Sequence, residues 1–508
     1  MFRFVVRSFA VLSALLTLLV AVLCVNTALF TYGFYSPADN ATTPKAATTL
    51  ATATLDSAAT LERLCGAVRI PTVSSERGGT NYIDTAAFEA MNAYLAANFP
   101  RCFATMQHET VGKYSHVFKW AGNATNEARN AKPVLLLAHL DVVPVEESSA
   151  NRWTHPPFEA TIADGYLWGR GTMDDKCAAL GLLEAAENLI AQGFTPARTI
   201  YFCFGHNEEI GGNGGAKAIA ELLSQRGVHA AWALDEGLVV VKGSFPGLTK
   251  PLALIGVTEK GYTTLHLETS LAQGGHSSMP PPVSAVGTLA RALTQLDTHP
   301  FPATFTPAVE QLFDVAGRET TLPMRIVFAN RWLFASILKS QLLAKPASAA
   351  LLRTTTALTM LEGGTKENVL PTRATAAVNF RILPSETVES VRRRVVDIIG
   401  DTAVHILANS GHSIGSNPAP VADMHGEGFM AIAASVRRVF PEAVSAPGIV
   451  VAITDSRHYA PVAENLYRFL PLVFDGTDFA RVHGIDERIA PTNYLSLVRF
   501  YTSLISTQ

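Results

Sequence analysis

The stretch Val134-Leu-Leu-Leu-Ala-His139-Leu-Asp141 decides the fold of this chain. Its first five residues form an uninterrupted apolar run, which is typical of a strand buried on both faces of a parallel sheet. The two polar residues stand two positions apart at the end of the strand, so their side chains share one face. The run therefore predicts a central strand that places His139 and Asp141 at one edge of a sheet.

Strands and helices alternate after this run. Helical spacing of leucine and alanine covers Ala178 to Ile190, and the apolar residues 199–204 predict a second strand. A second helix is predicted over 216–225 and a third strand over 231–234. This β-α-β-α-β order predicts an α/β fold, a mostly parallel sheet flanked by helices.

A change of pattern at about residue 258 predicts a small α+β domain that is inserted into the larger one. Its strands are expected at 263–268, 355–361 and 374–382, and its helices at 283–296 and 386–399. The predicted organisation is therefore a signal anchor or signal peptide at 1–35, a low-complexity stalk at 36–60, a catalytic domain at 61–257 and 411–508, and the inserted lid at 258–410.

The composition is that of a folded protein. Among 508 residues, 48% are hydrophobic and 16% are charged, which suits two buried cores and excludes a disordered chain. Lysine and arginine number 40 against 43 acidic residues, a net charge of -3, and we find no basic run. A nucleic-acid partner is therefore not expected.

The N-terminus carries one long apolar segment. Arg3 and Arg7 precede an uncharged stretch over 8–38, whose apolar part runs from Phe9 to Val25 and continues more weakly to Phe30. A signal-peptide core has about 7–15 apolar residues, whereas a spanning helix needs about 17–25. The length favours an uncleaved signal anchor over a cleaved signal peptide, and both stay open.

The positive flank of this segment predicts a cytosolic N-terminus and a body on the other side of the membrane. We expect a single-pass membrane protein of the secretory pathway with a lumenal or extracellular catalytic domain, as in a vacuole or lysosome. Cleavage of the segment would give a secreted protein instead. Two glycosylation triplets, Asn40-Ala-Thr42 and Asn123-Ala-Thr125, are compatible with either outcome.

Acidic pairs accompany the predicted strands at the edge where His139 lies. They are Asp174-Asp175 before the first helix, Glu208-Glu209 after the second strand and Asp235-Glu236 after the third. The crevice outside the carboxyl ends of parallel strands is where ligands bind, and carboxylates gathered there would repel each other without cations. Histidine and carboxylate ligands suit zinc, and they also suit cobalt or manganese.

Several further blocks accompany these pairs: Gly274-Gly-His-Ser-Ser-Met-Pro280, Leu352-Arg-Thr-Thr-Thr-Ala-Leu-Thr-Met360, Asn368-Val-Leu-Pro371, Asn379-Phe-Arg381, Thr454-Asp-Ser-Arg-His458 and Val482-His-Gly-Ile-Asp-Glu-Arg488. With them, the chain from about residue 60 onward resembles the dizinc metallopeptidase family of carboxypeptidase S, aminoacylase and carboxypeptidase G. The resemblance is greatest to carboxypeptidase S and to the secreted N-fatty-acyl-amino acid synthase/hydrolases.

The resemblance implies two Zn²⁺ ions per chain and five metal ligands: His139, Asp174, Glu209, Asp235 and His483. Asp174 would bridge the two ions. His139 and Asp235 would complete one ion, and Glu209 and His483 would complete the other. The adjacent glutamates Glu208 and Glu209 suit a division of roles, in which one is a metal ligand and the other is the general base.

The resemblance also implies the catalytic and substrate-binding residues. Glu208 would be the general base, and Asp141 would support His139 as a hydrogen-bonded carboxylate behind the metal ligand. Among the substrate residues, His276 would reach the site from the inserted domain, and Asn368 would bind the substrate. Arg381 would take its carboxylate, because a guanidinium binds carboxylates in two places. Arg457 is expected nearby, as a substrate contact or a structural pair.

The implied reaction is cleavage of the amide bond on the amino side of a C-terminal amino acid with a free carboxylate. The substrate would be a small peptide, as for carboxypeptidase S, or an N-fatty-acyl amino acid. A catalytically dead metal-binding ectodomain is the alternative outside enzymes, but Glu208 and all five ligand positions are intact. The resemblance also implies that the inserted domain is of ferredoxin-like type and acts as a lid or dimerisation domain, so the chain could form a homodimer.

The segment from about Phe301 to Ala350 is an addition within the predicted lid. Its part over 326–343 is strongly apolar but is interrupted by Arg331 and Lys339, so it is short for a spanning helix. Two interpretations stay open. The segment could be ordinary core, or its aromatic and aliphatic residues could line an acyl-side pocket or touch the membrane: Phe328, Trp332, Leu333 and Phe334.

Overall fold

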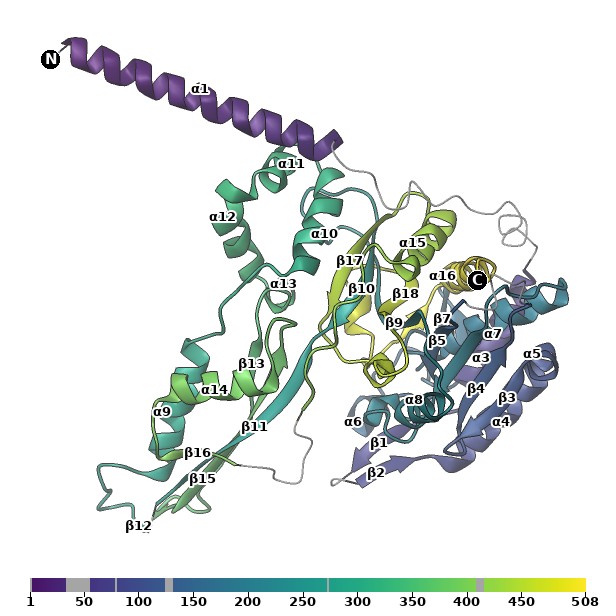
Figure 1. Cartoon of the computed structure of the whole chain (residues 1–508). Helices are drawn as coiled ribbons and strands as arrows, with labels where there is room; N and C mark the ends of the chain where they lie inside the picture. Colours follow the sequence, from purple (N-terminus) through teal and green to yellow (C-terminus); the bar gives the residue numbers. More distant parts are fainter. Residues whose placement is uncertain (1, 33–54, 78–79, 124–130, 272–273, 408–414) are drawn as a thin grey trace.

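A computed structural model describes residues 2–32, 55–77, 80–123, 131–271, 274–407 and 415–508 (Figure 1). Most of the predicted stalk and the predicted boundary at 408–411 lie outside these residues. The chain forms a large α/β domain, a smaller α+β domain beside it, and a long N-terminal helix that extends away from both (Figure 1).

An eight-stranded sheet forms the centre of the large domain. Its strands, in order across the sheet, are β17 (Val444–Val450), β10 (Leu252–Glu259), β18 (Leu466–Phe474), β9 (Trp232–Val241), β5 (Val134–His139), β8 (Ile200–Gly205), β4 (Ser115–Trp120) and β3 (Gln107–Val111). The central run β18-β9-β5-β8 is parallel, whereas β3, β4 and the β10 pairings with β9 and β18 are antiparallel. The mostly parallel sheet predicted from the sequence is confirmed.

Both faces of this sheet are buried, as the apolar run in β5 predicts. Leu136 packs into one hydrophobic cluster, and its neighbours Leu135 and Leu137 pack into another on the opposite face. The helices that contribute to these clusters are α3 (Ser57–Val68), α7 (Lys176–Ala191), α8 (Ala216–Gln225), α15 (Glu427–Val439) and α16 (Pro491–Ile505). Because β5 lies in the middle of the sheet, its carboxyl end is surrounded by the ends of β8 and β9.

Shorter elements complete the large domain. The helices are α4 (Thr85–Asn98), α5 (Pro100–Thr105) and α6 (Glu147–Ala150), with short 3-10 turns at η3 (Glu208–Ile210), η4 (Asp455–Tyr459) and η5 (Asp478–Ala480). The strands are β1 (Ser74–Arg77), β2 (Thr80–Ile83), β6 (Thr161–Ala163), β7 (Tyr166–Trp168) and β19 (Arg488–Ile489). Two of the turns, η3 and η4, carry residues of the candidate site.

The smaller domain is an antiparallel sheet covered by two helices, as the sequence predicts. The sheet has the order β13 (Thr355–Gly363), β15 (Arg373–Ile382), β11 (Gly261–Ser270) and β16 (Val404–Ile406). Helices α9 (Ala285–Thr298) and α14 (Val388–Ile399) pack their apolar sides on it. A small ribbon, β12 (Gly275–His276) with β14 (Val369–Leu370), lies at the far tip (Figure 1). Lys260 alone separates β10 from β11, so the two domains meet at that residue.

The additional segment at 301–350 packs on the large domain. It contains α10 (Pro307–Arg318), α11 (Leu322–Ala329), α12 (Arg331–Leu343) and α13 (Pro346–Ala350). Phe313 and Phe328 join the hydrophobic cluster that contains β10 and β17 residues. The ring of Phe328 stacks on that of Phe245, and the ring of Phe313 contacts Phe245 in a tilted arrangement. The segment was expected inside the lid. It instead covers the edge of the large sheet, because β17 is an edge strand whose apolar residues need a covering layer.

The N-terminal helix α1 runs from Phe2 to Tyr32. Among the described residues it is the one helix long and apolar enough to cross a membrane, over Arg7–Tyr32. Such a helix is compatible with a signal sequence or a membrane anchor. It also contacts α10 and α11, and the ring of Phe30 lies 5.2 Å from the guanidinium carbon of Arg318.

Candidate metal centre

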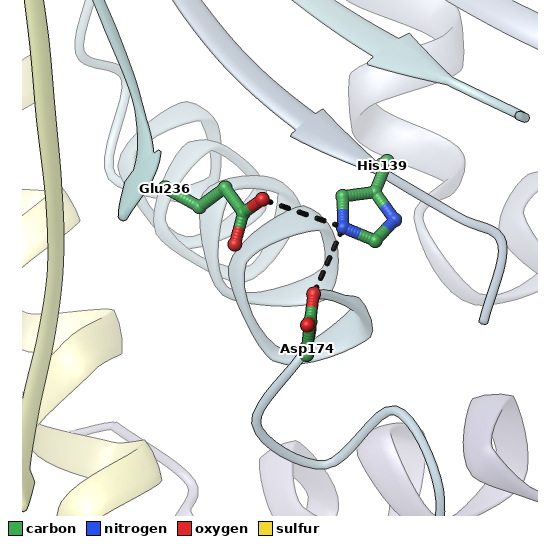
Figure 2. A group of neighbouring side chains, drawn as sticks. All are labelled: His139, Asp174 and Glu236. Atoms are coloured by element: carbon green, nitrogen blue, oxygen red, sulfur yellow. Dashed lines mark hydrogen bonds and ion pairs between the residues drawn. The ribbon is translucent and has the colours of Figure 1, made fainter. Parts of the chain in front are cut away.

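The carboxyl ends of β5, β8 and β9 bring the predicted metal ligands together. His139 is the last residue of β5, Asp174 lies just before α7, and Glu236 lies on β9 (Figure 2). Glu209 belongs to η3 after β8, and His483 comes from the segment before β19. Five segments far apart in the sequence thus meet at one edge of the sheet, as the rule for parallel sheets predicts.

One group of possible ligand atoms surrounds His139. Its Nε2 lies 3.0 Å from Oδ1 of Asp174 and 3.7 Å from Oε1 of Glu236 (Figure 2). Although burial lowers the pKa of His139, its hydrogen bonds with Asp141 and Asp174 raise that pKa well above the usual value. Carboxylates around a histidine nitrogen are an arrangement that would hold a divalent cation, with the imidazole in its neutral form.

A second group shares Asp174 with the first. Nε2 of His483 lies 3.0 Å from Oδ2 of Asp174 and 3.2 Å from Oε2 of Glu209. Hydrogen bonds to these carboxylates raise the pKa of His483 to about 10. The two carboxylate oxygens of Asp174 thus face different histidines, which is the arrangement that a bridging ligand requires.

The residues fit a pair of divalent cations. In each group, the three ligand atoms lie within 4.8 Å of one another, and the donors are histidine nitrogens and carboxylate oxygens. Oε1 of Glu209 is buried without a hydrogen-bond partner among the described residues. Burial and the negative charge of Asp174 raise the pKa of Glu209 to about 7. A cation would relieve both the unpaired oxygen and the repulsion.

Asp235 does not take the place expected for it. One of its carboxylate oxygens accepts a hydrogen bond from the backbone N–H of Glu236 at 3.0 Å, and the other accepts one from Ser456 at 2.6 Å. Its neighbour Glu236 faces His139 and Asp174 instead. Adjacent residues on a strand point to opposite faces, so only one of the pair can reach the site. An irregularity in the β9–β18 pairing falls between Asp235 and Leu238, directly after the pair.

Asp141 is a hydrogen-bond centre behind the ligands, where the sequence predicts a supporting carboxylate. Its Oδ1 lies 3.3 Å from Nδ1 of His139. It also accepts the backbone N–H groups of Glu208 at 3.0 Å and Glu209 at 3.1 Å, and a short hydrogen bond from the Ser74 hydroxyl. These contacts lower the pKa of Asp141 despite complete burial. A single ionised carboxylate thus fixes the ring of His139 and the turn that carries Glu208.

Glu208 lies half-buried at the start of η3. Burial and neighbouring carboxylates, with Asp455 and Glu209 foremost among them, raise the pKa of Glu208 well above the usual value. A carboxyl group with a raised pKa can accept a proton and keep it near neutral pH, which is the property of a general base that later acts as an acid.

A buried ion pair that we did not single out from the sequence supports the loop of Asp174. Glu487 is fully buried, pairs with Arg170 at 2.6 Å, and accepts the backbone N–H groups of Gly171 and Met173 at 2.9 Å. Arg170 also donates to the backbone oxygen of His483 at 3.2 Å. The pair thus ties together the two segments that carry Asp174 and His483. Glu487 lies in a quoted sequence block, but nothing there distinguishes it from a surface charge.

Two of the four predicted substrate residues, Arg381 and Arg457, interact electrostatically. Arg457, on η4, donates from Nη2 to the backbone oxygen of Gly211 at 2.9 Å, and Gly211 directly follows the turn that carries Glu208. Arg381, near the end of β15, is half-buried. Burial and the positive charge of Arg457 lower the pKa of Arg381. Within the described part of the chain, no ion pair is found between either arginine and a carboxylate, so this positive pair suits an anion.

The other two predicted substrate residues meet each other but not the metal ligands. His276 on β12 is exposed, and its Nδ1 lies 2.8 Å from the Ser278 hydroxyl. Asn368 accepts the backbone N–H of Ser277 at 3.2 Å. The ribbon that they form lies at the tip of the small domain, far from the ends of β5 and β9 (Figure 1). The expectation that His276 reaches the site is not met in this arrangement of the domains.

Known proteins resemble this chain over most of its length. It is 42% identical over 420 residues to "Probable carboxypeptidase S-like 2" of Dictyostelium discoideum, covering 82% of this chain and 79% of the relative. It is 41% identical over 444 residues to "N-fatty-acyl-amino acid synthase/hydrolase PM20D1.1" of Danio rerio, covering 86% and 84%. These identities are high enough to assign the chain to a family.

Solved structures share the fold. An M20 family metallo-carboxypeptidase from Sulfolobus solfataricus superposes with a TM-score of 0.61 at 16% identity, covering 88% of this chain and 98% of that one. A peptidase from Bacillus subtilis described as a dinuclear metal-binding member of the M20 family gives 0.53 at 13%, covering 89% and 98%. The model of "Peptidase family M20/M25/M40" matches residues 135–507. The chain therefore belongs to peptidase family M20/M25/M40 and is a metallo-carboxypeptidase or amidohydrolase.

Proposed function

We propose that this protein is a membrane-anchored dizinc hydrolase that cleaves the amide bond on the amino side of a C-terminal amino acid with a free carboxylate. The observation that carries the proposal is the pair of ligand groups that share Asp174, with Glu208 beside them and Arg381 and Arg457 nearby. Ligands, base and anion site are the three parts that such a reaction needs.

In this proposal His139, Asp174 and Glu236 hold one Zn²⁺, and Asp174, Glu209 and His483 hold the other. Glu236 takes the role that the sequence suggested for Asp235. Bound zinc would polarise the scissile carbonyl and activate water near neutral pH. Two divalent cations bring four positive charges against the three carboxylates of this set, which favours binding of further anionic groups.

Glu208 is the proposed general base. It takes a proton from the attacking water and returns it to the leaving amine, which needs a carboxyl that can hold the proton for one turnover. The backbone N–H of Glu208 donates a hydrogen bond to Asp141, and this contact holds the turn that carries the Glu208 side chain in place. We therefore assign Asp141 a positioning role toward both the base and His139.

Arg381 and Arg457 are the proposed carboxylate site. Two positive groups at close range repel each other, and a substrate carboxylate between them would remove that repulsion and accept charge-assisted hydrogen bonds. This requirement explains a preference for a free C-terminal carboxylate in peptides and N-acyl amino acids alike.

Closure of the small domain is the proposed route by which His276 and Asn368 reach a substrate. The connection between β10 and β11 at Lys260 would act as the hinge. A homodimer is a further possibility that one observation favours. The edge strand β13 exposes Leu358, Met360 and Leu361, an apolar edge suited to pairing with a second copy.

We also propose that α1 is retained as an anchor with the catalytic domain on the lumenal or extracellular side. A cleaved signal would have no lasting contacts with the mature protein, whereas Asn26 of α1 donates to Asn330 at 2.9 Å and Thr27 is buried against the body. Resistance of the protein to alkaline extraction from membranes would support the anchor, and release into the soluble fraction would contradict it.

A substrate panel tests the reaction. Full-length protein would be assayed on acetyl-, octanoyl- and oleoyl-phenylalanine and on dipeptides, with and without a chelator. Burial of the acyl chain gains about 0.8 kcal/mol per methylene, so a rising kcat/KM along the acyl series favours N-fatty-acyl amino acids. A flat or falling series with good dipeptide turnover favours a carboxypeptidase S-like peptidase. Absence of any chelator-sensitive turnover would overturn the proposed function.

A further inference from the structure

The corner between α11 and α12 is attached to the N-terminal helix. Asn330 separates the two helices and is fully buried. Its Oδ1 accepts a hydrogen bond from Asn26 at 2.9 Å, and its Nδ2 lies 3.4 Å from the Thr27 hydroxyl and from the backbone oxygen of Leu23. These contacts fix the height of the α11–α12 corner along α1.

The proposed anchoring of α1 places this height relative to a membrane. A spanning helix needs about 20 residues to cross the hydrocarbon core. Counted from Ser8, directly after Arg7, such a span would end near Thr27. With α1 spanning in this way, the corner at Asn330 would lie at the boundary between the hydrocarbon core and the headgroups. Hydrogen bonds between helices are compatible with this depth, because they satisfy both partners away from water.

The outward side of the two helices is apolar at this level. Leu322, Trp332, Leu333 and Ile337 are exposed by 61%, 61%, 42% and 59%. Their buried neighbours Phe328 and Leu338 point into the core of the large domain, so the exposed residues are not a continuation of that core. Tryptophan in particular prefers the interface between lipid and water. We call the helices α11 and α12 together the collar.

The charged residues of the collar have partners on the protein itself. Arg331 pairs with Asp314 on α10 at 2.8 Å, and Arg325 donates to the backbone oxygen of Thr320 at 2.8 Å. The ammonium group of Lys339 lies 5.3 Å from the centre of the Phe305 ring. Each of these cations thus has a contact within the protein, which lowers its need for water on a surface that faces lipid, although Nε of Arg325 is buried without a hydrogen-bond partner among the described residues.

We propose that the collar is a second membrane-binding element, whose exposed apolar residues insert into the lumenal leaflet beside α1. The occupant of this surface is the lipid bilayer itself, because the collar is continuous with the helix that enters it. The inference rests on the proposed anchoring of α1. Two attachment points, one spanning and one lying in the interface, fix the orientation of the catalytic domain above the membrane, which a spanning helix on a flexible connection could not do.

Tryptophan fluorescence offers a direct test. The chain has five tryptophans, and the four besides Trp332 are buried in the large domain: Trp120, Trp153, Trp168 and Trp232. Full-length protein would be reconstituted into vesicles of phosphatidylcholine or of dibrominated phosphatidylcholine, whose bromines quench at contact. Bromine in both leaflets makes the result independent of the orientation of the protein. We expect a loss of emission in brominated vesicles that the conservative variant Trp332→Phe no longer shows.

Variants that carry the tryptophan at another position provide the matched control. In the Trp332→Phe background, Ile337→Trp places tryptophan elsewhere on the collar, and Leu361→Trp places it on the exposed edge of the small domain. Brominated lipid should quench the first and leave the second unchanged. Water-soluble acrylamide should show the opposite order.

Two results would overturn the proposal. Equal lipid quenching of wild type and Trp332→Phe, with Trp332 open to acrylamide, would place the collar in water. Protection of Trp332 from both quenchers would indicate that another protein copy covers it. Alkaline extraction of the same vesicles shows whether α1 still anchors the protein, so a failure of the collar proposal can be distinguished from a failure of the anchor. Enzyme activity is not measured in this experiment. An integral protein without Trp332 quenching would thus refute the collar alone.

Discussion

The metal centre and the substrate residues of the small domain are built in different ways. The ligands come from the ends of neighbouring strands, and hydrogen bonds through Asp141 and Glu487 hold the segments that carry them. His276 lies on the two-stranded ribbon at the distant tip, and Asn368 directly precedes the other strand of that ribbon. The two segments are joined by the hydrogen bond from the backbone N–H of Ser277 to the backbone oxygen of Asn368. The difference indicates that the chemistry is preorganised and that substrate recognition has to be assembled by movement or by a partner.

Among the predicted effects, substitution of the proposed general base at the metal centre should reduce kcat the most. Glu208→Gln removes the proton acceptor but keeps size and backbone, so we expect kcat to fall by about 10²–10⁴-fold. Metal content, measured by elemental analysis, should stay that of the wild type. Glu221→Gln, an exposed glutamate on α8, is the matched control and should change neither value. Retention of near-normal kcat in Glu208→Gln would contradict the assignment.

The neighbouring pair on β9 separates the sequence-based and structure-based ligand sets. Glu236→Gln should reduce metal content from two ions per chain to one, because an amide is a poor zinc ligand. Asp235→Asn keeps an acceptor for only one of the two backbone N–H groups, those of Glu236 and Ser456, and should lower metal affinity at most by the roughly 10–100-fold seen for residues behind the ligands. Elemental analysis after dialysis decides, and the reverse order would restore Asp235 as the ligand.

The carboxylate site should affect binding more than chemistry. Arg381→Lys keeps the charge but loses the planar fork, and hydrogen bonds to charged groups contribute about 1.5–3 kcal/mol. We expect KM to rise by roughly 10–100-fold with a smaller change in kcat. Arg373→Lys, on the same strand and paired with Glu268 at the surface, is the control. A drop in kcat at constant KM would argue for a role in the reaction itself.

Domain closure should give the smallest signal. A substrate analogue that engages both domains should make the particle more compact, measured as a lower radius of gyration in X-ray scattering of the full-length protein in nanodiscs. Gly261→Ala at the hinge should suppress the change, because the added Cβ would lie 2.4 Å from the backbone oxygen of Ser416. Identical scattering with and without the analogue would leave a partner subunit as the source of His276.

Much of the fold could be predicted because the patterns are local. The apolar run before His139 predicts a strand that is buried on both faces, and the alternation of strands and helices predicts a parallel sheet. In a parallel sheet, ligands bind at the carboxyl ends of the strands, so the edge that carries the site also follows from the sequence. His139, Asp174, Glu209 and His483 were predicted as a set and lie together in the structure. The N-terminal helix also follows from length and composition alone.

Other features depend on contacts between distant residues. The sequence contains the pair Asp235-Glu236, but the register of β9 against β18 determines which carboxylate faces the site. Arg170 and Glu487 are ordinary charges until the fold buries them together. The segment at 301–350 is apolar in any reading, yet only packing decides that Phe328 belongs to the core while Trp332 faces outward beside α1. The periodicity of apolar residues predicts which face of an element is buried. It does not specify which other residues pack against that face, because those contacts form only in the folded chain.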